Sequence, residues 1–174
     1  MSAPLWHDGR MHATLRKPVP ADAGAIADLH VATWRETYTH LLPADYFSEA
    51  YITGRHRMWE QVLAHPQEDV AIRVAESDGS IVGFSWAGPS IAEDGAEPPR
   101  ARQLYAIYLR QAHHGSGVGQ ALLDAALGSG PAMLWVAKEN PRAIAFYRRN
   151  GFRLDGVEQI DPHTPAITDA RMLR

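Results

Sequence analysis

Hydrophobic and polar positions alternate with two different periods along this chain, and each change of period marks an expected element. In residues 26–38 the apolar and aromatic side chains recur every three or four positions, the spacing of one face of an α-helix. Residues 47–63 show the same spacing, although Gly54 lowers the helix propensity there. Residues 13–17 come first and end before Pro18, which predicts a strand. The chain is therefore expected to begin with a strand and two helices.

The middle of the chain predicts a β-hairpin. Residues 70–76 and 80–87 are rich in β-branched and apolar side chains, and Ser-Asp-Gly at 77–79 separates them. An Asp-Gly pair between two such runs is a strong hairpin signal, because it favours the left-handed backbone of a tight turn. Residues 88–102 carry prolines and acidic side chains in place of an apolar pattern. We expect them to form a mobile loop beside the functional site.

A strand, a glycine-rich loop and a helix follow in that order. Residues 104–109 are an apolar run that predicts a strand buried on both faces. Gly115, Gly117 and Gly119 lie in the next loop, and a helical pattern continues from there to Leu127. Backbone N–H groups of such a loop, at a helix N-terminus, can bind an anion such as a phosphate. Taken alone, the loop is equally consistent with a tight strand-to-helix turn.

The C-terminal third predicts a strand, a short helix and an antiparallel strand pair. Residues 132–138 are an apolar run, and the Asn-Pro pair at 140–141 is typical of a helix start. The Asn-Gly pair at 150–151 is typical of a helix end. Residues 152–160 and 167–173 predict the closing strand pair. The order of strands and helices along the chain favours an α/β fold with a mixed sheet.

Composition places the chain among single-domain globular proteins. It has 174 residues, of which 45% are hydrophobic and 21% are charged, and about 100–200 residues make one domain. We expect one domain over residues 13–174, preceded by a flexible tail at residues 1–12. The net charge of −3 predicts no general attraction to nucleic acid. No apolar run approaches the roughly 20 residues of a membrane span, and the first residues lack the apolar stretch of a secretory signal, so a cytoplasmic location without a membrane partner is expected.

Several kinds of chemistry are disfavoured by the residues present. The chain has no cysteine, which excludes disulfides and an acyl-cysteine intermediate. Its nine histidines lack the spacing of a metal site, so we expect no metal. Gln120 and Ala121 follow the last loop glycine, where a phosphate-binding P-loop has Lys and then Ser or Thr. Ser85 lies within an expected hairpin strand, so we do not expect a hydrolase nucleophile there.

Two motifs at a fixed separation carry a resemblance to a known family. Residues 103–109 resemble the central strand of the GNAT superfamily of acetyl-CoA-dependent N-acetyltransferases, and residues 114–119 (His-Gly-Ser-Gly-Val-Gly) resemble its pyrophosphate loop. Residues 140–152 are similar to its N-x-x-A-x-x-F-Y-x-x-x-G-F segment. The order of expected elements also fits, so the resemblance covers nearly everything after residue 12. It implies an acyl-CoA N-acyltransferase fold, with a mixed, mostly antiparallel central sheet flanked by helices.

The resemblance implies direct transfer of an acetyl group from acetyl-CoA to an amine of a small molecule or peptide, within a ternary complex. The loop amides would hold the diphosphate, and the strand before the loop would pair with the pantetheine arm. Family members often dimerise, so a homodimer is one expected state. The residues implied at the cofactor are Ile107, Tyr108, Leu109, His114, Gly115, Ser116, Gly117, Val118, Gly119, Gln120, Asn140, Ala143, Phe146, Tyr147 and Arg149.

Tyr147 is the general acid that the resemblance implies. A phenol with a pKa of about 10 can protonate the leaving thiolate, whereas without the two motifs the same position would be interpreted as part of a packing face. The acceptor site is expected to contain five further residues, whose aromatic members are equally consistent with core packing. They are Trp34, Tyr38, Trp86, Gln103 and Tyr105.

The general base is left open by the sequence. Gln103 stands where many family members have a catalytic Glu, and an amide has no basic site. An alkyl amine with a pKa near 10 is only about one part in a thousand neutral at pH 7. Either a water chain reaches Glu36, Glu76 or a histidine, or the acceptor is weakly basic. The alternative function is a catalytically weak acyl-CoA-binding sensor module.

Overall fold

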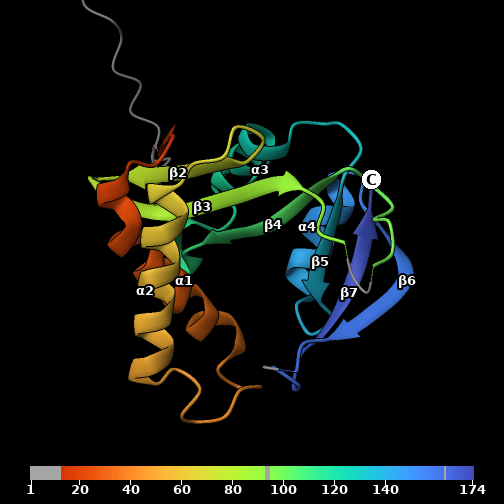
Figure 1. The fold of residues 1–174 in the computed structure, drawn as a ribbon, viewed down its shortest axis with the longest axis horizontal. Coiled ribbons are helices and arrows are strands. Elements are labelled where there is room, and N and C mark those ends of the chain that lie inside the picture. The colour runs from red at the N-terminus through yellow and green to blue at the C-terminus, as the bar shows by residue number, and fades with distance from the viewer. Residues whose placement is uncertain (1–12, 93–94, 163) are drawn as a thin grey trace, which may run out of the picture.

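The described residues form one seven-stranded sheet, four α-helices in two pairs, and two short 3-10 helices at Pro20–Asp22 and Gln111–His113 (Figure 1). The computed structural model describes residues 13–92, 95–162 and 164–174, so the expected tail at residues 1–12 lies outside the described residues. The strands follow the spatial order β1-β2-β3-β4-β5-β7-β6. They are β1 Thr14–Arg16, β2 Ala71–Ser77, β3 Ser80–Pro89, β4 Arg102–Leu109, β5 Met133–Ala137, β6 Arg153–Ile160 and β7 Thr168–Leu173, and the helices are α1 Ala23–Tyr38, α2 Glu49–Ala64, α3 Val118–Leu127 and α4 Pro141–Arg149.

The local turn signals in the sequence are confirmed by the backbone. Ser77 pairs with Ser80 across the hairpin of β2 and β3, and the two residues between them have positive φ angles of 51° at Asp78 and 74° at Gly79. These angles are those of a two-residue hairpin turn. The predicted start of α4 is also confirmed, because the Asn140 side chain accepts a hydrogen bond from the backbone N–H of Ala143 at 3.1 Å.

Each face of the sheet is covered by one pair of helices. The α1–α2 face holds a core in which Trp59 of α2 contacts Phe84 of β3, with ring centroids 4.9 Å apart. The other face holds the core of α3 and α4, which contains the fully buried Leu123 and Phe152. All neighbouring strands are antiparallel except β4 and β5. The predicted α/β fold with a mixed, mostly antiparallel sheet flanked by helices is confirmed.

The parallel pair of β4 and β5 separates after only two residue pairs. Gln103 pairs with Met133 and Leu104 pairs with Leu134, and no pairing continues beyond them among the described residues. Leu104 is buried, but residues 105–109 are only half-buried. The prediction of a strand buried on both faces is therefore wrong for the second half of β4. The physical reason is that β5 diverges from β4 and leaves an opening in the middle of the sheet.

A small apolar cluster closes one end of this opening. Leu42, from the segment between α1 and α2, packs with Ala137 at the end of β5 and with Ile167 just before β7. Trp34 and Tyr38 of α1 pack against the same cluster. Two segments far apart in the sequence therefore meet where the two halves of the sheet diverge.

Among the helices of the described ranges, none has the length and apolar character required to cross a bilayer.

Candidate active site

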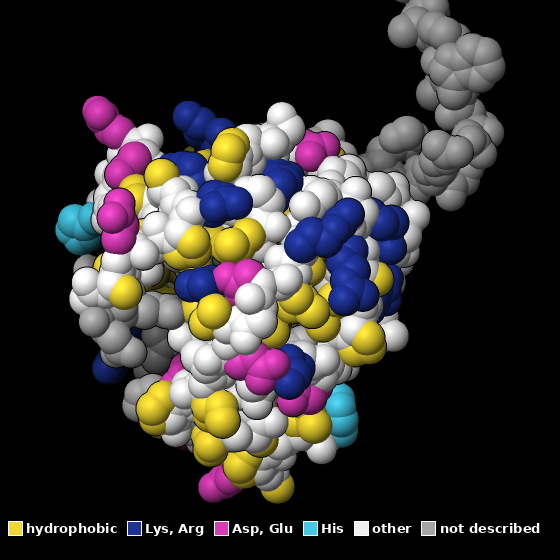
Figure 2. Space-filling view, turned by 90° about the vertical axis from the view of Figure 1, so that its right-hand side faces the viewer, with side chains coloured by type: hydrophobic (Ala, Val, Ile, Leu, Met, Phe, Trp, Pro, Cys, Tyr) yellow, Lys and Arg dark blue, Asp and Glu magenta, His cyan; other side chains and the backbone are white. Residues whose placement is uncertain are grey.

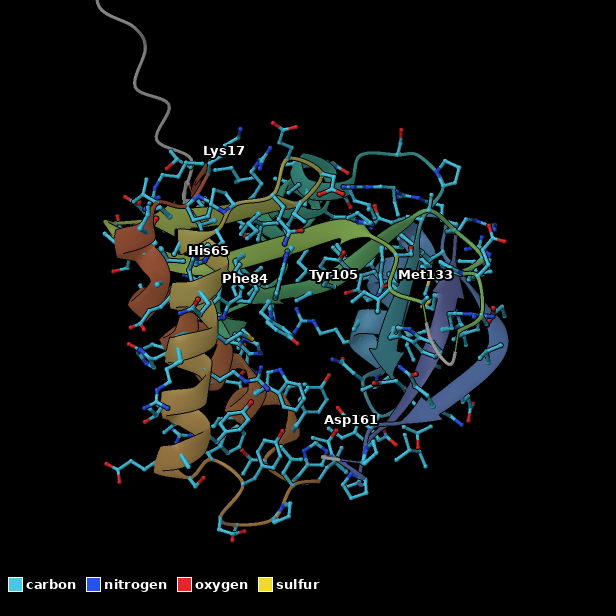
Figure 3. The ribbon with its side chains drawn as sticks, viewed as in Figure 1. Lys17, His65, Phe84, Tyr105, Met133 and Asp161 are labelled. Atoms are coloured by element: carbon cyan, nitrogen blue, oxygen red, sulfur yellow. The ribbon has the colours of Figure 1, made fainter. Side chains whose placement is uncertain are left out.

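A cavity of about 680 Å³ occupies the opening between β4 and β5. Its walls come from α1, β4, the glycine loop, β5, α4 and the segment that leads into β7. Figure 3 shows the labelled Tyr105 and Asp161 side chains on opposite sides of this opening. Cavities of about 300–1,000 Å³ are the usual size for small-molecule sites, so this cavity can hold a sizeable ligand.

The glycine loop forms an anion-binding cradle at one end of the cavity. Gly115 and Gly117 line the cavity and have positive φ angles of 76° and 89°, which a residue with a side chain rarely adopts. Gly117 is also the cap of α3, and an added Cβ there would meet no other atom within 4 Å. The positive end of the helix dipole of the ten-residue α3 therefore lies at this loop, where the Val118 N–H donates to Ser116 Oγ at 3.4 Å and Gly119 and Gln120 of the first turn line the cavity.

Arginine side chains add positive charge beside this cradle. Arg142 and Arg149 of α4 both line the cavity, and Arg148 and Arg153 are exposed nearby in the sequence. Figure 2 faces the side of the molecule that carries β6, β7 and α4, and shows Lys and Arg side chains gathered on part of it. A ligand with several phosphates would find a favourable local field here despite the net charge of −3.

The edge of β4 that faces β5 is available to a ligand. Residues 106–109 pair with β3 on one side, and Tyr105 lies at an irregularity of that pairing. On the other side, residues 105–109 have no strand partner among the described residues. At the end of this edge, the His114 side chain contacts the carbonyl oxygen of Leu109 through Nε2 at 2.9 Å. An extended ligand with amide groups can add to such an edge by backbone hydrogen bonding. The edge runs from the centre of the sheet toward the glycine loop.

Tyr147 lies where the edge of β4, helix α4 and helix α1 come together. Its side chain lines the cavity, and its ring packs edge-on against Phe146 and Phe152. Burial raises the pKa of Tyr147 well above its usual value, and the neighbouring phenols of Tyr108 and Tyr38 raise it further. The hydroxyl therefore keeps its proton at neutral pH and can act as a donor.

Asn140 and Tyr38 connect α4 to α1 across the cavity. The Asn140 side chain caps α4 through Oδ1 and donates from Nδ2 to the Tyr38 hydroxyl at 3.3 Å. Burial raises the pKa of Tyr38, the hydrogen bond from Asn140 lowers it, and the charges of Asp169 and Glu139 raise it. Trp34, one helical turn before Tyr38, stacks on Tyr46 with an interplanar angle of 9°. Trp34 and Tyr38 therefore form an aromatic wall of the cavity, and Tyr46 stacks on Trp34 without lining the cavity.

The structure brings most of the predicted site residues together, but not all of them. Trp34, Tyr38 and Tyr105 line the cavity, whereas Trp86 packs between Trp59 and Tyr105 and does not. Gln103 is also absent from the lining, and its Oε1 accepts a hydrogen bond from the backbone N–H of Ile91 at 3.0 Å. Among the cofactor residues, Ser116 and Val118 do not line the cavity, and those that do are Ile107, Tyr108, Leu109, His114, Gly115, Gly117, Gly119, Gln120, Asn140, Ala143, Phe146, Tyr147 and Arg149.

Two of the alternative proton acceptors, Glu76 and Glu36, are ion-paired with arginines. Glu76 pairs with Arg16 at 2.9 Å, between β1 and β2 and away from the cavity. Glu36 lines the cavity, but one oxygen pairs with Arg110 at 3.0 Å and the other accepts from the backbone N–H of Gln111 at 3.1 Å. Glu36 therefore fastens α1 to the segment that leads into the glycine loop.

Two carboxylates that the sequence analysis missed also line the cavity. Asp161 directly follows β6, and Asp169 lies near the start of β7. The only sequence signal was their position at the ends of two expected strands.

Ser85 is fully buried, and its hydroxyl donates to the carbonyl oxygen of Leu122 at 2.8 Å. Within the described ranges, no group of three or more acidic or histidine side chains could hold a metal ion.

Comparisons with known proteins agree with this geometry. Residues 68–154 match a family model described as "Acetyltransferase (GNAT) domain". A "Probable N-acetyltransferase" of Mycobacterium tuberculosis is 30% identical over 149 residues, which cover 82% of this chain and 80% of that protein. An uncharacterized N-acetyltransferase of Bacillus subtilis is 30% identical over 142 residues, covering 78% of this chain and 77% of that protein.

The fold itself is shared with solved structures. The crystal structure of PaiA N-acetyltransferase from Thermoplasma acidophilum, in complex with coenzyme A, superposes with a TM-score of 0.69 at 20% identity. The match covers 94% of this chain and 99% of that chain. Taken together with the family model and the two bacterial relatives, this shows that the chain belongs to the GNAT family of acetyltransferases.

Proposed function

We propose that this protein transfers the acetyl group of acetyl-CoA directly to an amine of a small molecule or peptide, within a ternary complex. The observation that carries the proposal is the opening between β4 and β5, which has an anion-binding cradle at one end and a buried phenol on its wall. A cofactor with a diphosphate, an amide-containing arm and a terminal thioester matches this arrangement in order.

The described residues fit coenzyme A along its length. The diphosphate would lie on the backbone amides of residues 114–120, near Arg149. The amides of the pantetheine arm would pair with the free edge of β4 at residues 107–109 and with the Asn140 side chain. Ala143 and Phe146 would contact the arm from α4. The shared fold of the coenzyme A complex described above supports this placement.

Transfer then needs one bond to form and one to break. The neutral amine attacks the thioester carbonyl carbon, a C–N bond forms, and the C–S bond breaks as the tetrahedral intermediate collapses. The leaving sulfur takes the proton of the Tyr147 hydroxyl, which burial keeps protonated. A positioned acid of this kind contributes about 10²–10⁴-fold in rate.

Tyr147→Phe tests the assignment of the acid. We expect kcat to fall about 10²-fold, while the Kd for coenzyme A measured by calorimetry stays within about threefold, because the ring still packs on Phe146 and Phe152. Tyr46→Phe is the matched control, since it removes the hydroxyl of a tyrosine that stacks on Trp34 but does not line the cavity. Full turnover by the Tyr147 variant would remove the acid role.

Two outcomes would reject the function itself. Absence of heat on mixing the protein with coenzyme A or acetyl-CoA would show that the cradle does not bind the cofactor. Binding without any amine-stimulated release of thiol would favour the alternative, a sensor module that binds acyl-CoA with little catalysis.

A further inference from the structure

The reaction needs a proton acceptor that Gln103 does not supply. An alkyl ammonium with a pKa near 10 is only about one part in a thousand neutral at pH 7. Gln103 has no basic site, and its carbonyl oxygen is bound to the N–H of Ile91. Glu76 is paired at the far side of the sheet, and both oxygens of Glu36 are engaged.

His114 contacts the carbonyl oxygen of Leu109 beside the glycine loop, where the diphosphate would lie. Besides Glu36, the carboxylates of the described residues that line the cavity are Asp161 and Asp169.

Asp169 is held on the cavity wall by the sheet. It lies in β7 between two neighbouring strands, opposite Ala137 of β5 and opposite Gln159 of β6. A residue fixed by strand pairing on both sides has a well-defined position, which proton transfer requires. Its side chain lines the same cavity as Tyr147.

Asp169 and the proposed acid Tyr147 both interact electrostatically with the Tyr38 hydroxyl. After burial, which has the largest effect, the charge of Asp169 contributes to raising the pKa of Tyr38. Tyr38 in turn contributes to the raised pKa of Tyr147, and it accepts a hydrogen bond from Asn140. Asp169 of β7, Tyr147 of α4 and Tyr38 of α1 thus line one cavity, and Tyr38 interacts electrostatically with both of the others.

Asp161, the other carboxylate of the cavity, is less well placed. It lies beyond the end of β6, outside the strand pairing, as Figure 3 shows. Its charge acts on Tyr46, in the segment between α1 and α2, and not on the phenol that contacts Asn140. This position is suited to a contact with the acceptor away from the thioester.

We propose that Asp169 is the general base that accepts the proton of the acceptor amine, directly or through one water. This rests on the proposed acetyl transfer. The ammonium gives one proton to the carboxylate, and the neutral nitrogen forms the C–N bond. As the C–S bond breaks, the sulfur takes the proton of Tyr147, and the second proton of the nitrogen restores the Tyr147 hydroxyl. Asp169 then gives its proton to water, so each turnover releases one proton overall.

Asp169→Asn, measured on two amines, tests the proposal. For an alkyl amine with a pKa near 10, we expect kcat/KM to fall about 10²–10³-fold. For an aromatic amine with a pKa near 5, which is already neutral at pH 7, we expect less than about a threefold change. Coenzyme A affinity should not change. Glu158→Gln is the matched control, because Glu158 is the preceding neighbour of Gln159 on β6, is ion-paired with Lys138, and does not line the cavity.

Two further variants separate a base from a merely structural carboxylate. Asp169→Glu keeps a carboxylate, so it should retain more activity on the alkyl amine than Asp169→Asn does. Asp161→Asn should affect both amines by the same factor. An equal loss on both amines in Asp169→Asn, or no loss on either, would overturn the assignment.

The proposed function can fail separately. If the unaltered protein transfers acetyl to neither amine, acetyl transfer is rejected and the assignment of the base falls with it. If the unaltered protein is active and the two amines respond alike to Asp169→Asn, only the base is rejected.

Discussion

His30 is neutral in the folded protein because aromatic rings of α1, α2 and the sheet enclose it. Only 7% of its surface is exposed, and its Nδ1 accepts a hydrogen bond from the indole N–H of Trp59 at 3.2 Å. The rings of Tyr108 and Phe84 lie 4.9 Å and 5.9 Å from its own ring. Burial, followed by the charge of Arg55, lowers the pKa of His30 to about 3. A buried polar residue thus supports the strand that would bind the cofactor arm.

This lowered pKa predicts acid sensitivity in a defined range. An unfolded histidine titrates near 6.5. Between about pH 6.5 and pH 3, this residue therefore binds a proton in the unfolded state but not in the folded state. Stability from His30 is therefore complete above 6.5, and about 2 kcal/mol of it is lost by pH 5. In urea unfolding at pH 7 and pH 5, His30→Gln should lose about 2 kcal/mol less than the unaltered protein between the two pH values.

His56→Gln is the control for this measurement, because His56 is exposed enough to pair with Asp28 on the surface. Its loss of stability between the two pH values should stay close to that of the unaltered protein. Equal pH sensitivity of His30→Gln and the unaltered protein would show that His30 is not the residue responsible.

At the scale of elements, Gly117, the residue that precedes α3, sets the backbone conformation at the N-terminus of the helix. Gly117 turns the chain with a φ of 89°, and the helix begins at Val118, with Gly119 and Gln120 of its first turn lining the cavity. The helix itself is ordinary, with Leu122 and Leu123 buried against the sheet. Its function therefore depends on the conformation of one residue outside the helix.

Gly117→Ala should separate stability from binding. We expect a cost of about 1 kcal/mol in the free energy of unfolding, because an alanine at this φ is strained. Coenzyme A should bind at least about tenfold more weakly by calorimetry, since the new methyl group would stand in the anion cradle. Gly79→Ala, at a φ of 74° in the hairpin turn, should cost similar stability and leave binding unchanged. Equal affinity in both variants would contradict the cradle.

On the scale of the whole molecule, the strands form one sheet in which β4 and β5 separate. On either side of β4 and β5 the strands pair over most of their lengths, while these two share only two residue pairs. A bound cofactor arm would complete the hydrogen bonding of the β4 edge. The two halves of the molecule would then be joined along the opening as well as at the cluster of Leu42, Ala137 and Ile167.

Cofactor binding should therefore protect a restricted set of backbone amides. In hydrogen exchange, we expect coenzyme A to slow exchange in residues 105–109 and 115–120, with no specific change in β1. At about 100 times its Kd it should stabilise the fold by about 2.7 kcal/mol, which corresponds to roughly 5–10 °C in Tm. Uniform protection across all strands, or protection that spares the β4 edge, would contradict a site between β4 and β5.

The sequence alone determined those features that depend on neighbours a few residues apart. The hairpin turn at Asp78 and Gly79, the Asn140 cap and the glycine loop follow from backbone preferences and short-range hydrogen bonds, and each is present in the structure. The order of helices and strands followed from hydrophobic periodicity in the same way. These signals favoured an α/β fold with a mixed sheet, and the resemblance of residues 103–109, 114–119 and 140–152 to the GNAT superfamily implied the family.

Only the tertiary structure decided which side chains share the cavity. The second half of β4 is half-buried because β5 diverges from it, and no local pattern in residues 105–109 encodes a distant strand. Trp86 and Gln103 do not line the cavity because their partners are Trp59 and the backbone of Ile91. Asp169 lines it because β7 pairs beside β5. The physical reason is that these outcomes depend on contacts between segments far apart in the chain, which local preferences do not specify.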